Sequence, residues 1–412
     1  MFTKSEQESN LKTDSNHLQG INKLVIDAVI SITDTVESLH HRINRVSCVK
    51  GHPAQERTSG ITGAVYNVVR GVTALVGNAL NQPLKIIGDA FSERPHDPSL
   101  MAMRAALNGV LGDYLHNQKN SLAIDMHFSA NNQRLSEPSL IEMLDHAIQN
   151  NNGKLLILAH GLCMNDRQWS HKGHDHGKAL SRELGATSLY LNYNSGLHIS
   201  DNGQHFAELL EKIVTLAQKR VRISIVAHSM GGLVSRSAHQ YAQTVQHQWP
   251  DYVGNMVFLG TPHHGAPLEK TGNWLDLLLA SHPYSAPFAK LIKIRSSGIT
   301  DLHHGNLSAQ DWQQRNRFDF RADTRKPAPL PEEIACFAVA GSIGEGFREK
   351  HLPIIGDGLV EVDSALGRHS LKPYTLSFQP QNQLHVRGVD HLHLLSEPRV
   401  YEKMLHWLRD KT

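Results

Sequence analysis

Short apolar runs and amphipathic segments alternate along the chain from about residue 120 onward. The run from Ile223 to Ala227 is β-branched and apolar, as a buried central strand is, and the segments between the runs repeat apolar positions every three or four residues, as helices do. Strands are predicted over 154–161, 187–192, 223–227, 256–260, 336–341 and 384–389, and helices over 136–148, 174–184, 204–217 and 396–408. A hairpin that turns at Asn131 and Asn132 is predicted ahead of them. This order predicts an α/β fold with a mostly parallel sheet covered on both faces, and ligands gather at the carboxyl ends of such strands.

The chain before about residue 118 has a helical pattern throughout. Apolar positions spaced by three or four predict one long amphipathic helix over 21–43 and a second over 61–80. Asp97 followed by Pro98 is typical of the start of a third helix, because an aspartate caps the helix and proline suits its first position. The second helix either packs against protein or lies on a membrane surface, and its pattern leaves both open.

Two domains follow from these patterns. Residues 1–118 are expected to form an N-terminal helical region without evident chemistry, and residues 119–412 the sheet-containing domain. The strand–helix alternation stops between 262 and 331, where a leucine-rich stretch suggests helices without strands. We expect this insertion to form a cap over the site.

Charge and cysteine content exclude some classes of protein. The chain has 41 lysine and arginine residues against 39 aspartate and glutamate residues, a net charge of +2, so no strong field points to a nucleic-acid partner. Its three cysteines have no metal-binding spacing and fit a reducing compartment. The first residues contain no apolar core of a signal peptide, so we expect a cytoplasmic protein and leave contact with a membrane open.

The strongest chemical signal is the segment VRISIVAHSMGGLVSRS. The predicted strand that ends at Ala227 must turn sharply at Ser229 to enter the helix that follows. Such a turn requires small residues two positions on either side of its apex, and Ala227 and Gly231 stand there. Ser229 is therefore a candidate nucleophile exposed at the end of the sheet. The alternative interpretation is a serine that only caps an ordinary helix.

A serine nucleophile needs a base and an acid at neighbouring strand ends. His391 follows the last predicted strand and is the preferred base, with His393 as its competitor. Asp357 stands between two glycines after strand 336–341 and is the preferred acid, with Asp363 as runner-up. Asp357 could instead only stabilise its own Asp-Gly turn. The resulting order Ser, Asp, His is the one that the α/β-hydrolase topology requires.

An anionic tetrahedral intermediate needs two backbone N–H donors near the nucleophile. Met230 directly follows Ser229 and begins a helix, so its N–H has no helical acceptor. The second donor is expected after strand 154–161, where Gly161 lets the chain bend and Leu162 can aim its N–H inward.

Several motifs resemble a bacterial group of α/β-hydrolases related to the GPI inositol-deacylase-like and triacylglycerol lipase families. The motifs are AHGL, AHSMGGLVSRSA, VFLGTPHHGAPLE, GDGLVEVDSALG and VDHLHLLSEPRVYEKMLHWL, and they span most of the chain from about residue 120. The resemblance implies an α/β-hydrolase fold and an esterase or lipase acting on carboxylic esters with lipid-like acyl groups. Carried over by motif, the site consists of the nucleophile Ser229, the acid Asp357, the base His391 and the oxyanion-hole donors Leu162 and Met230.

No cofactor and no metal are expected. Secreted triacylglycerol lipases commonly hold a structural calcium through an aspartate two positions after the catalytic histidine, and this chain has His393 there. The histidine-rich stretch around 166–176 lacks any established zinc spacing. His263 and His264 follow strand 256–260 and either border the acyl pocket or pack against protein.

Three functions remain open at this point. The preferred one is cleavage of a small-molecule or lipid ester through an acyl-enzyme. The same triad would also serve a thioesterase or an amidase, because the leaving group is selected by the pocket. In the third, the hydrolase fold is catalytically silent and binds a membrane or a partner, and the N-terminal helices could also join copies of the chain into a homo-oligomer.

Overall fold

A computed structural model describes residues 96–266, 296–313, 325–344 and 356–409, and a few positions between 84 and 92. The chain divides into two compact units, residues 1–104 with 279–294, and residues 105–278 with 295–412. The predicted helices over 21–43 and 61–80 and most of the leucine-rich cap lie outside the described residues. The predicted domain boundary at residue 118 stays a prediction.

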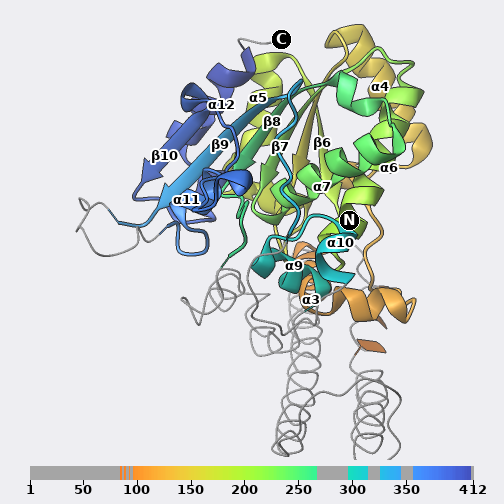
Figure 1. Cartoon of the computed structure of the whole chain (residues 1–412). Coiled ribbons are helices and arrows are strands. Elements are labelled where there is room, and N and C mark those ends of the chain that lie inside the picture. Colours follow the sequence, from red (N-terminus) through yellow and green to blue (C-terminus); the bar gives the residue numbers. More distant parts are fainter. Residues whose placement is uncertain are drawn as a thin grey trace, which may run out of the picture. The chain divides into compact units, whose positions relative to one another are not determined.

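The second unit is built on an eight-stranded sheet with the order β10-β9-β8-β7-β3-β6-β1-β2 (Figure 1). Its strands are β1 (His127–Ala130), β2 (Gln133–Arg134), β3 (Lys154–Ala159), β6 (Thr187–Asn192), β7 (Arg222–His228), β8 (Val253–Leu259), β9 (Ala335–Ser342) and β10 (Gln383–Arg387). All pairs from β6 to β10 are parallel, and β1 is antiparallel to both of its neighbours. The predicted α/β-hydrolase fold is thereby confirmed for the sheet.

The hairpin of β1 and β2 turns where the sequence predicts it. Asn131 and Asn132 have φ values of 51° and 63°. Two successive positive φ values match the right-handed twist of a two-residue hairpin, and asparagine tolerates them better than most residues. The sheet therefore ends in an antiparallel edge.

The helices are α3 (Pro98–Asn117), α4 (Glu137–Asn150), α5 (His176–Leu184), α6 (Ile199–Leu216), α7 (Met230–Val245), α9 (Ser297–His304), α10 (Ala309–Gln313), α11 (Val362–Ala365) and α12 (Pro398–Arg409). The Asp97 carboxylate accepts the N–H groups of Ser99 and Leu100, as predicted for the cap of α3. Among the described residues, no helix combines the length and apolar character that a membrane crossing needs.

Two predicted helix starts were wrong. The helix predicted from residue 204 begins at Ile199, whose N–H donates to the Asp301 carboxylate at 3.0 Å, so a distant residue caps it. The helix predicted from His174 begins at His176 instead. His174 and Asp175 form strand β5, which pairs with β4 (Ser170–His171), and Asp175 then caps α5 through the N–H of Lys178. At the start of α6 a tertiary contact outweighs the local helical pattern, and at the start of α5 a short local hairpin does.

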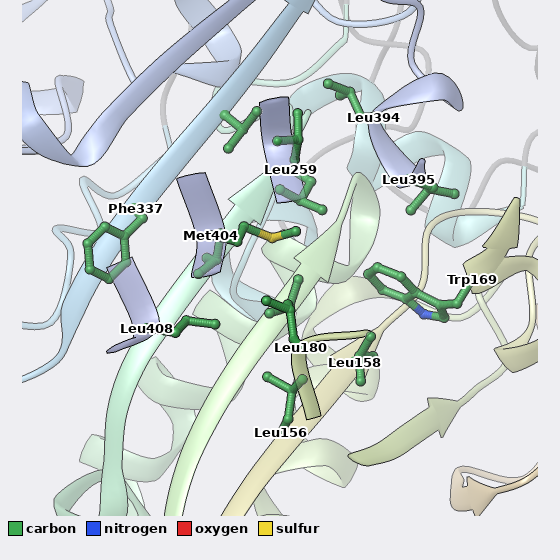
Figure 2. Packing of buried hydrophobic residues seen from close by; sticks show 14 of the residues in the cluster. Leu156, Leu158, Trp169, Leu180, Leu259, Phe337, Leu394, Leu395, Met404 and Leu408 are labelled. Atoms are coloured by element: carbon green, nitrogen blue, oxygen red, sulfur yellow. The ribbon is translucent and has the colours of Figure 1, made fainter. Parts of the chain in front are cut away.

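Alternate residues of the central strands face two separate layers of the core. Val226, Val257 and Leu259 belong to the cluster that α5 and α12 cover, which Figure 2 shows with Leu180, Met404 and Leu408. Their neighbours Ile225 and Phe258 are equally buried and point to the opposite face. There α6 and α7 pack so closely that a Cβ on Gly203 would lie 2.3 Å from Ser237 Oγ. The strand ends are thus held rigidly from both sides.

Candidate active site

Ser229 occupies a strained turn between β7 and α7. Its φ and ψ are 53° and −123°, a conformation that a non-glycine residue adopts only when the surrounding structure enforces it. Its N–H donates to the Leu259 carbonyl at 2.9 Å, and its hydroxyl makes no capping bond to the helix. The simple cap interpretation of this serine therefore does not hold.

The residues around Ser229 are small because backbone lies against them. A Cβ on Gly231 would lie 2.4 Å from the Ala159 carbonyl oxygen and 2.6 Å from that of His160. A Cβ on Gly161 would lie 3.0 Å from Ser229 Cβ. The loop after β3 and the turn at Ser229 are consequently in direct contact, which the predicted site requires.

Asp357 and His391 are joined by a short hydrogen bond. His391 Nδ1 lies 2.7 Å from Asp357 Oδ2, and both residues are only 2% exposed. The other carboxylate oxygen accepts the N–H groups of Leu359 and Val360, and the His391 N–H donates to the Asp357 carbonyl. Asp357 therefore stabilises its own turn and binds the imidazole at the same time, so the two interpretations of this residue are compatible.

The competing residues stand apart from this pair. Asp363 is exposed and lies 3.3 Å from Arg368 in a surface ion pair. The His393 ring lies 3.4 Å from Lys172 Nζ. Neither contacts the buried Asp357–His391 pair through a hydrogen bond that involves the described residues.

Gly260 brings the pair next to the turn at Ser229. It follows Leu259, whose carbonyl binds the Ser229 N–H, and a Cβ on Gly260 would lie 3.1 Å from both Asp357 Oδ2 and His391 Cε1. Within the described residues, no hydrogen bond joins the Ser229 hydroxyl to the His391 ring. Such bonds often tighten only when substrate is present.

The two expected oxyanion donors lie on the loops that meet at Ser229. Met230 is the first residue of α7, so its N–H has no acceptor within the helix. Leu162 is buried in the turn after β3. The next N–H along that turn belongs to Cys163 and donates to Ser195 Oγ at 3.0 Å. Of these two neighbouring amides, only that of Leu162 remains for a substrate oxyanion.

Comparison with known proteins finds similarity to several hydrolases. A family described as a domain of unknown function, DUF7379, matches residues 126–291. A mature lipase of Bacillus licheniformis is 20% identical over 62% of this chain and 92% of its own, with a TM-score of 0.38. A Burkholderia cenocepacia protein proposed to be an aryl esterase is 14% identical over 63% of this chain and 91% of its own, with a TM-score of 0.36. The thioesterase RedJ of Streptomyces coelicolor is 13% identical over 63% and 90%, with a TM-score of 0.33. The fold assignment rests on the strand order and connections described above.

His228 is a neighbour of the site that the sequence did not single out. Its Nε2 lies 3.1 Å from the His391 carbonyl oxygen, and the two rings are 4.6 Å apart. Burial holds the pKa of His228 well below its usual range, so the ring is neutral and its one proton serves this bond. The motif places His228 beside Ser229, but nothing in the pattern indicates its contact with a distant loop.

The histidine-rich stretch makes hydrogen bonds within the fold. His174 Nε2 lies 2.9 Å from His176 Nδ1, and His176 Nε2 lies 2.9 Å from the Leu394 carbonyl oxygen. Asp175 caps α5, and Asp166 accepts the Ser129 hydroxyl at 2.6 Å. In the part of the chain that the structure describes, no group of three such side chains converges as a metal site.

Buried neutral histidines should make the fold sensitive to acid. Burial lowers the pKa of His160 and of His176 to about 4. Unfolded histidine titrates near 6.5, so between about pH 4 and 6.5 the unfolded chain binds more protons than the folded one. The free energy of unfolding should therefore fall as pH is lowered through this window and be fully regained above about pH 7.

Urea unfolding between pH 4.5 and 8 measures this dependence. His176→Gln should reduce its slope near pH 5 by about 1 kcal/mol per pH unit, because one proton fewer is taken up on unfolding. The exposed His146→Gln serves as the control. An equal slope in wild type and His176→Gln would contradict the expectation.

Proposed function

We propose that this chain is a serine hydrolase that cleaves carboxylic esters through Ser229, His391 and Asp357. One observation supports the proposal. A strained serine turn and a buried carboxylate–imidazole pair lie together at the carboxyl ends of the parallel strands. Ser229, Asp357 and His391 follow β7, β9 and β10 in the chain, and the carboxyl ends of these parallel strands lie on the same side of the sheet. A serine, an acid and a histidine in this chain order are typical of α/β-hydrolases.

The proposed reaction is a two-step acyl transfer. Ser229 Oγ attacks the ester carbonyl carbon while His391 Nε2 takes its proton, and Asp357 Oδ2 accepts a hydrogen bond from the Nδ1–H of the resulting imidazolium. The tetrahedral intermediate collapses, and His391 returns the proton to the departing alcohol. Water then attacks the acyl-serine with His391 again as the base, and a carboxylic acid leaves.

The N–H groups of Leu162 and Met230 are proposed to hold the oxyanion of both tetrahedral intermediates. Their loops meet at Ser229, since Gly161 lies against its Cβ and Met230 follows it in the chain. Fixed donors of this kind stabilise the transition state because they need no reorganisation as charge develops.

The acyl group is proposed to be lipid-like, as the motif resemblance implies. Thioesters and amides would use the same three residues, so a thioesterase or an amidase is the second candidate. The proposed homo-oligomer and membrane contact depend on helices outside the described residues and stay predictions.

Labelling with a fluorophosphonate probe tests the proposal directly, since only an activated serine reacts with it. We expect one adduct, located at Ser229 by peptide mass spectrometry, and none in Ser229→Ala. No labelling of the folded wild-type protein would favour the catalytically silent alternative. Matched nitrophenyl esters, thioesters and anilides of increasing acyl length then separate the ester, thioester and amide activities.

His228 is proposed to position the base by holding the His391 backbone. His228→Phe keeps a ring beside His391 but loses the donor to its carbonyl, so kcat should fall about 10-fold with KM unchanged. His228→Gln restores an N–H donor and should recover most of this loss. If the Phe and Gln variants have the same kcat, the hydrogen bond is unimportant for positioning.

A further inference from the structure

Arg236 carries a buried positive charge that pairs with no carboxylate of the described residues. It lies on α7, about two turns beyond Ser229, and is only 6% exposed. Its Nη1 lies 3.3 Å from His263 Nδ1, its Nη2 donates to the Ala328 carbonyl, and its Nε has no partner. No carboxylate among the described residues forms an ion pair with this guanidinium. Buried charges are normally paired, because desolvation is costly.

Three side chains near Arg236 add positive charge or none. The Arg325 guanidinium is also buried and acts on Arg236 by repulsion. Burial holds the pKa of His263 well below its usual range and raises that of the Cys336 thiol to about 12, so both are neutral. Burial and Arg325 together lower the pKa of Arg236 only to about 10, which leaves it charged at neutral pH.

The acid nearest to these cations is already engaged. One oxygen of Asp311 accepts the N–H groups of Leu307 and Ser308 at 3.0 and 2.9 Å, and the other accepts the N–H of Lys326 at 3.3 Å. Its charge is thus directed at backbone amides. It does not form an ion pair with Arg236 in the described part of the chain.

A small pocket lies among these groups. It has a volume of about 20 Å³ and is lined by Arg236, His263, His264, Arg325, Lys326 and Tyr374, together with Asp311 and parts of 305–307 and Ala328. This volume suits one water-sized ligand and is too small for a tetrahedral oxyanion. The buried His264 Nε2 also has no hydrogen-bond partner here.

We infer that this pocket binds a single halide-sized anion, and that this anion is chloride when the solution contains chloride. The anion supplies the negative charge that Arg236 lacks and accepts hydrogen bonds from guanidinium N–H groups. It thereby links α7 to the loop after β8, to the segment around Arg325 and to Tyr374. This inference does not depend on the proposed hydrolase activity.

The melting temperature in sodium chloride, compared with sodium gluconate at equal ionic strength and pH, tests the site. Gluconate is too bulky for the pocket, so chloride and bromide should each raise Tm by about 2 °C or more in a saturable way. Arg236→Met should abolish this difference, and the exposed Arg220→Gln should retain it. An equal Tm of wild type in both salts would overturn the inference, as would a chloride effect that persists in Arg236→Met.

A second measurement needs no variant. Crystals of the wild-type chain soaked in sodium bromide should show an anomalous scattering peak between Arg236 and His264. A pocket without such a peak overturns the inference even if Arg236→Met fails to fold. Stabilisation by sodium phosphate but not by chloride would also overturn it, because the inferred ligand is monoatomic.

Discussion

Replacing Ser229 with alanine is expected to lower kcat for ester hydrolysis by about 10⁴- to 10⁶-fold. The change removes only the hydroxyl group. Because this group makes no capping hydrogen bond to α7, folding should be unaffected. The residual rate would come from bound substrate and from the N–H groups of Leu162 and Met230, which remain in place. Steady-state kinetics on a nitrophenyl ester, with Tm measured in parallel, check both parts.

Ser235→Ala is the matched control for this experiment. Ser235 lies on the same helix, is buried, and donates its hydroxyl to the Gly231 carbonyl at 2.8 Å. Its replacement should leave kcat within about threefold of wild type while lowering stability slightly. Esterase activity that survives in Ser229→Ala at the wild-type level would exclude Ser229 as the nucleophile.

Much of the fold could be predicted because each strand carries its own signal. The apolar runs of β3, β7 and β8 are buried on both faces and stand out in the sequence. The turn at Ser229 could be predicted for a related reason, since backbone carbonyls against Gly231 leave no room for a side chain there. These features depend on local sequence.

Features created by distant contacts could not be predicted. The start of α6, for example, is fixed by Asp301, which lies 102 residues further along the chain. The role of His228 depends on its hydrogen bond to the His391 carbonyl, and that of Arg236 on its burial without an ion-pair partner among the described residues. Neither feature is visible as a sequence pattern. The sequence therefore predicts site residues whose identity is restricted by a turn or a strand end. It does not predict residues whose role depends on contacts with distant segments.

Asp357→Asn is expected to lower kcat by about 10⁴-fold, because it forces the wrong tautomer on His391. The oxygen of the asparagine amide is needed at the Oδ1 position, where the N–H groups of Leu359 and Val360 must be accepted. Its NH₂ group then faces His391 Nδ1, which can only accept. The remaining ring proton moves to Nε2, and the imidazole can no longer take the proton of Ser229.

The control for this prediction is Asp363→Asn, at the other aspartate that the sequence offers. Its carboxylate is exposed and pairs only with Arg368 at the surface, so kcat should change less than about twofold. Because Asp357→Asn preserves the two backbone hydrogen bonds of its turn, its Tm should stay close to that of wild type. An unchanged Tm would show that the lost activity comes from the wrong His391 tautomer and not from unfolding. If Asp363→Asn proves to be the inactive variant and Asp357→Asn retains activity, the acid must be reassigned to Asp363, and the 2.7 Å bond between Asp357 and His391 would be purely structural.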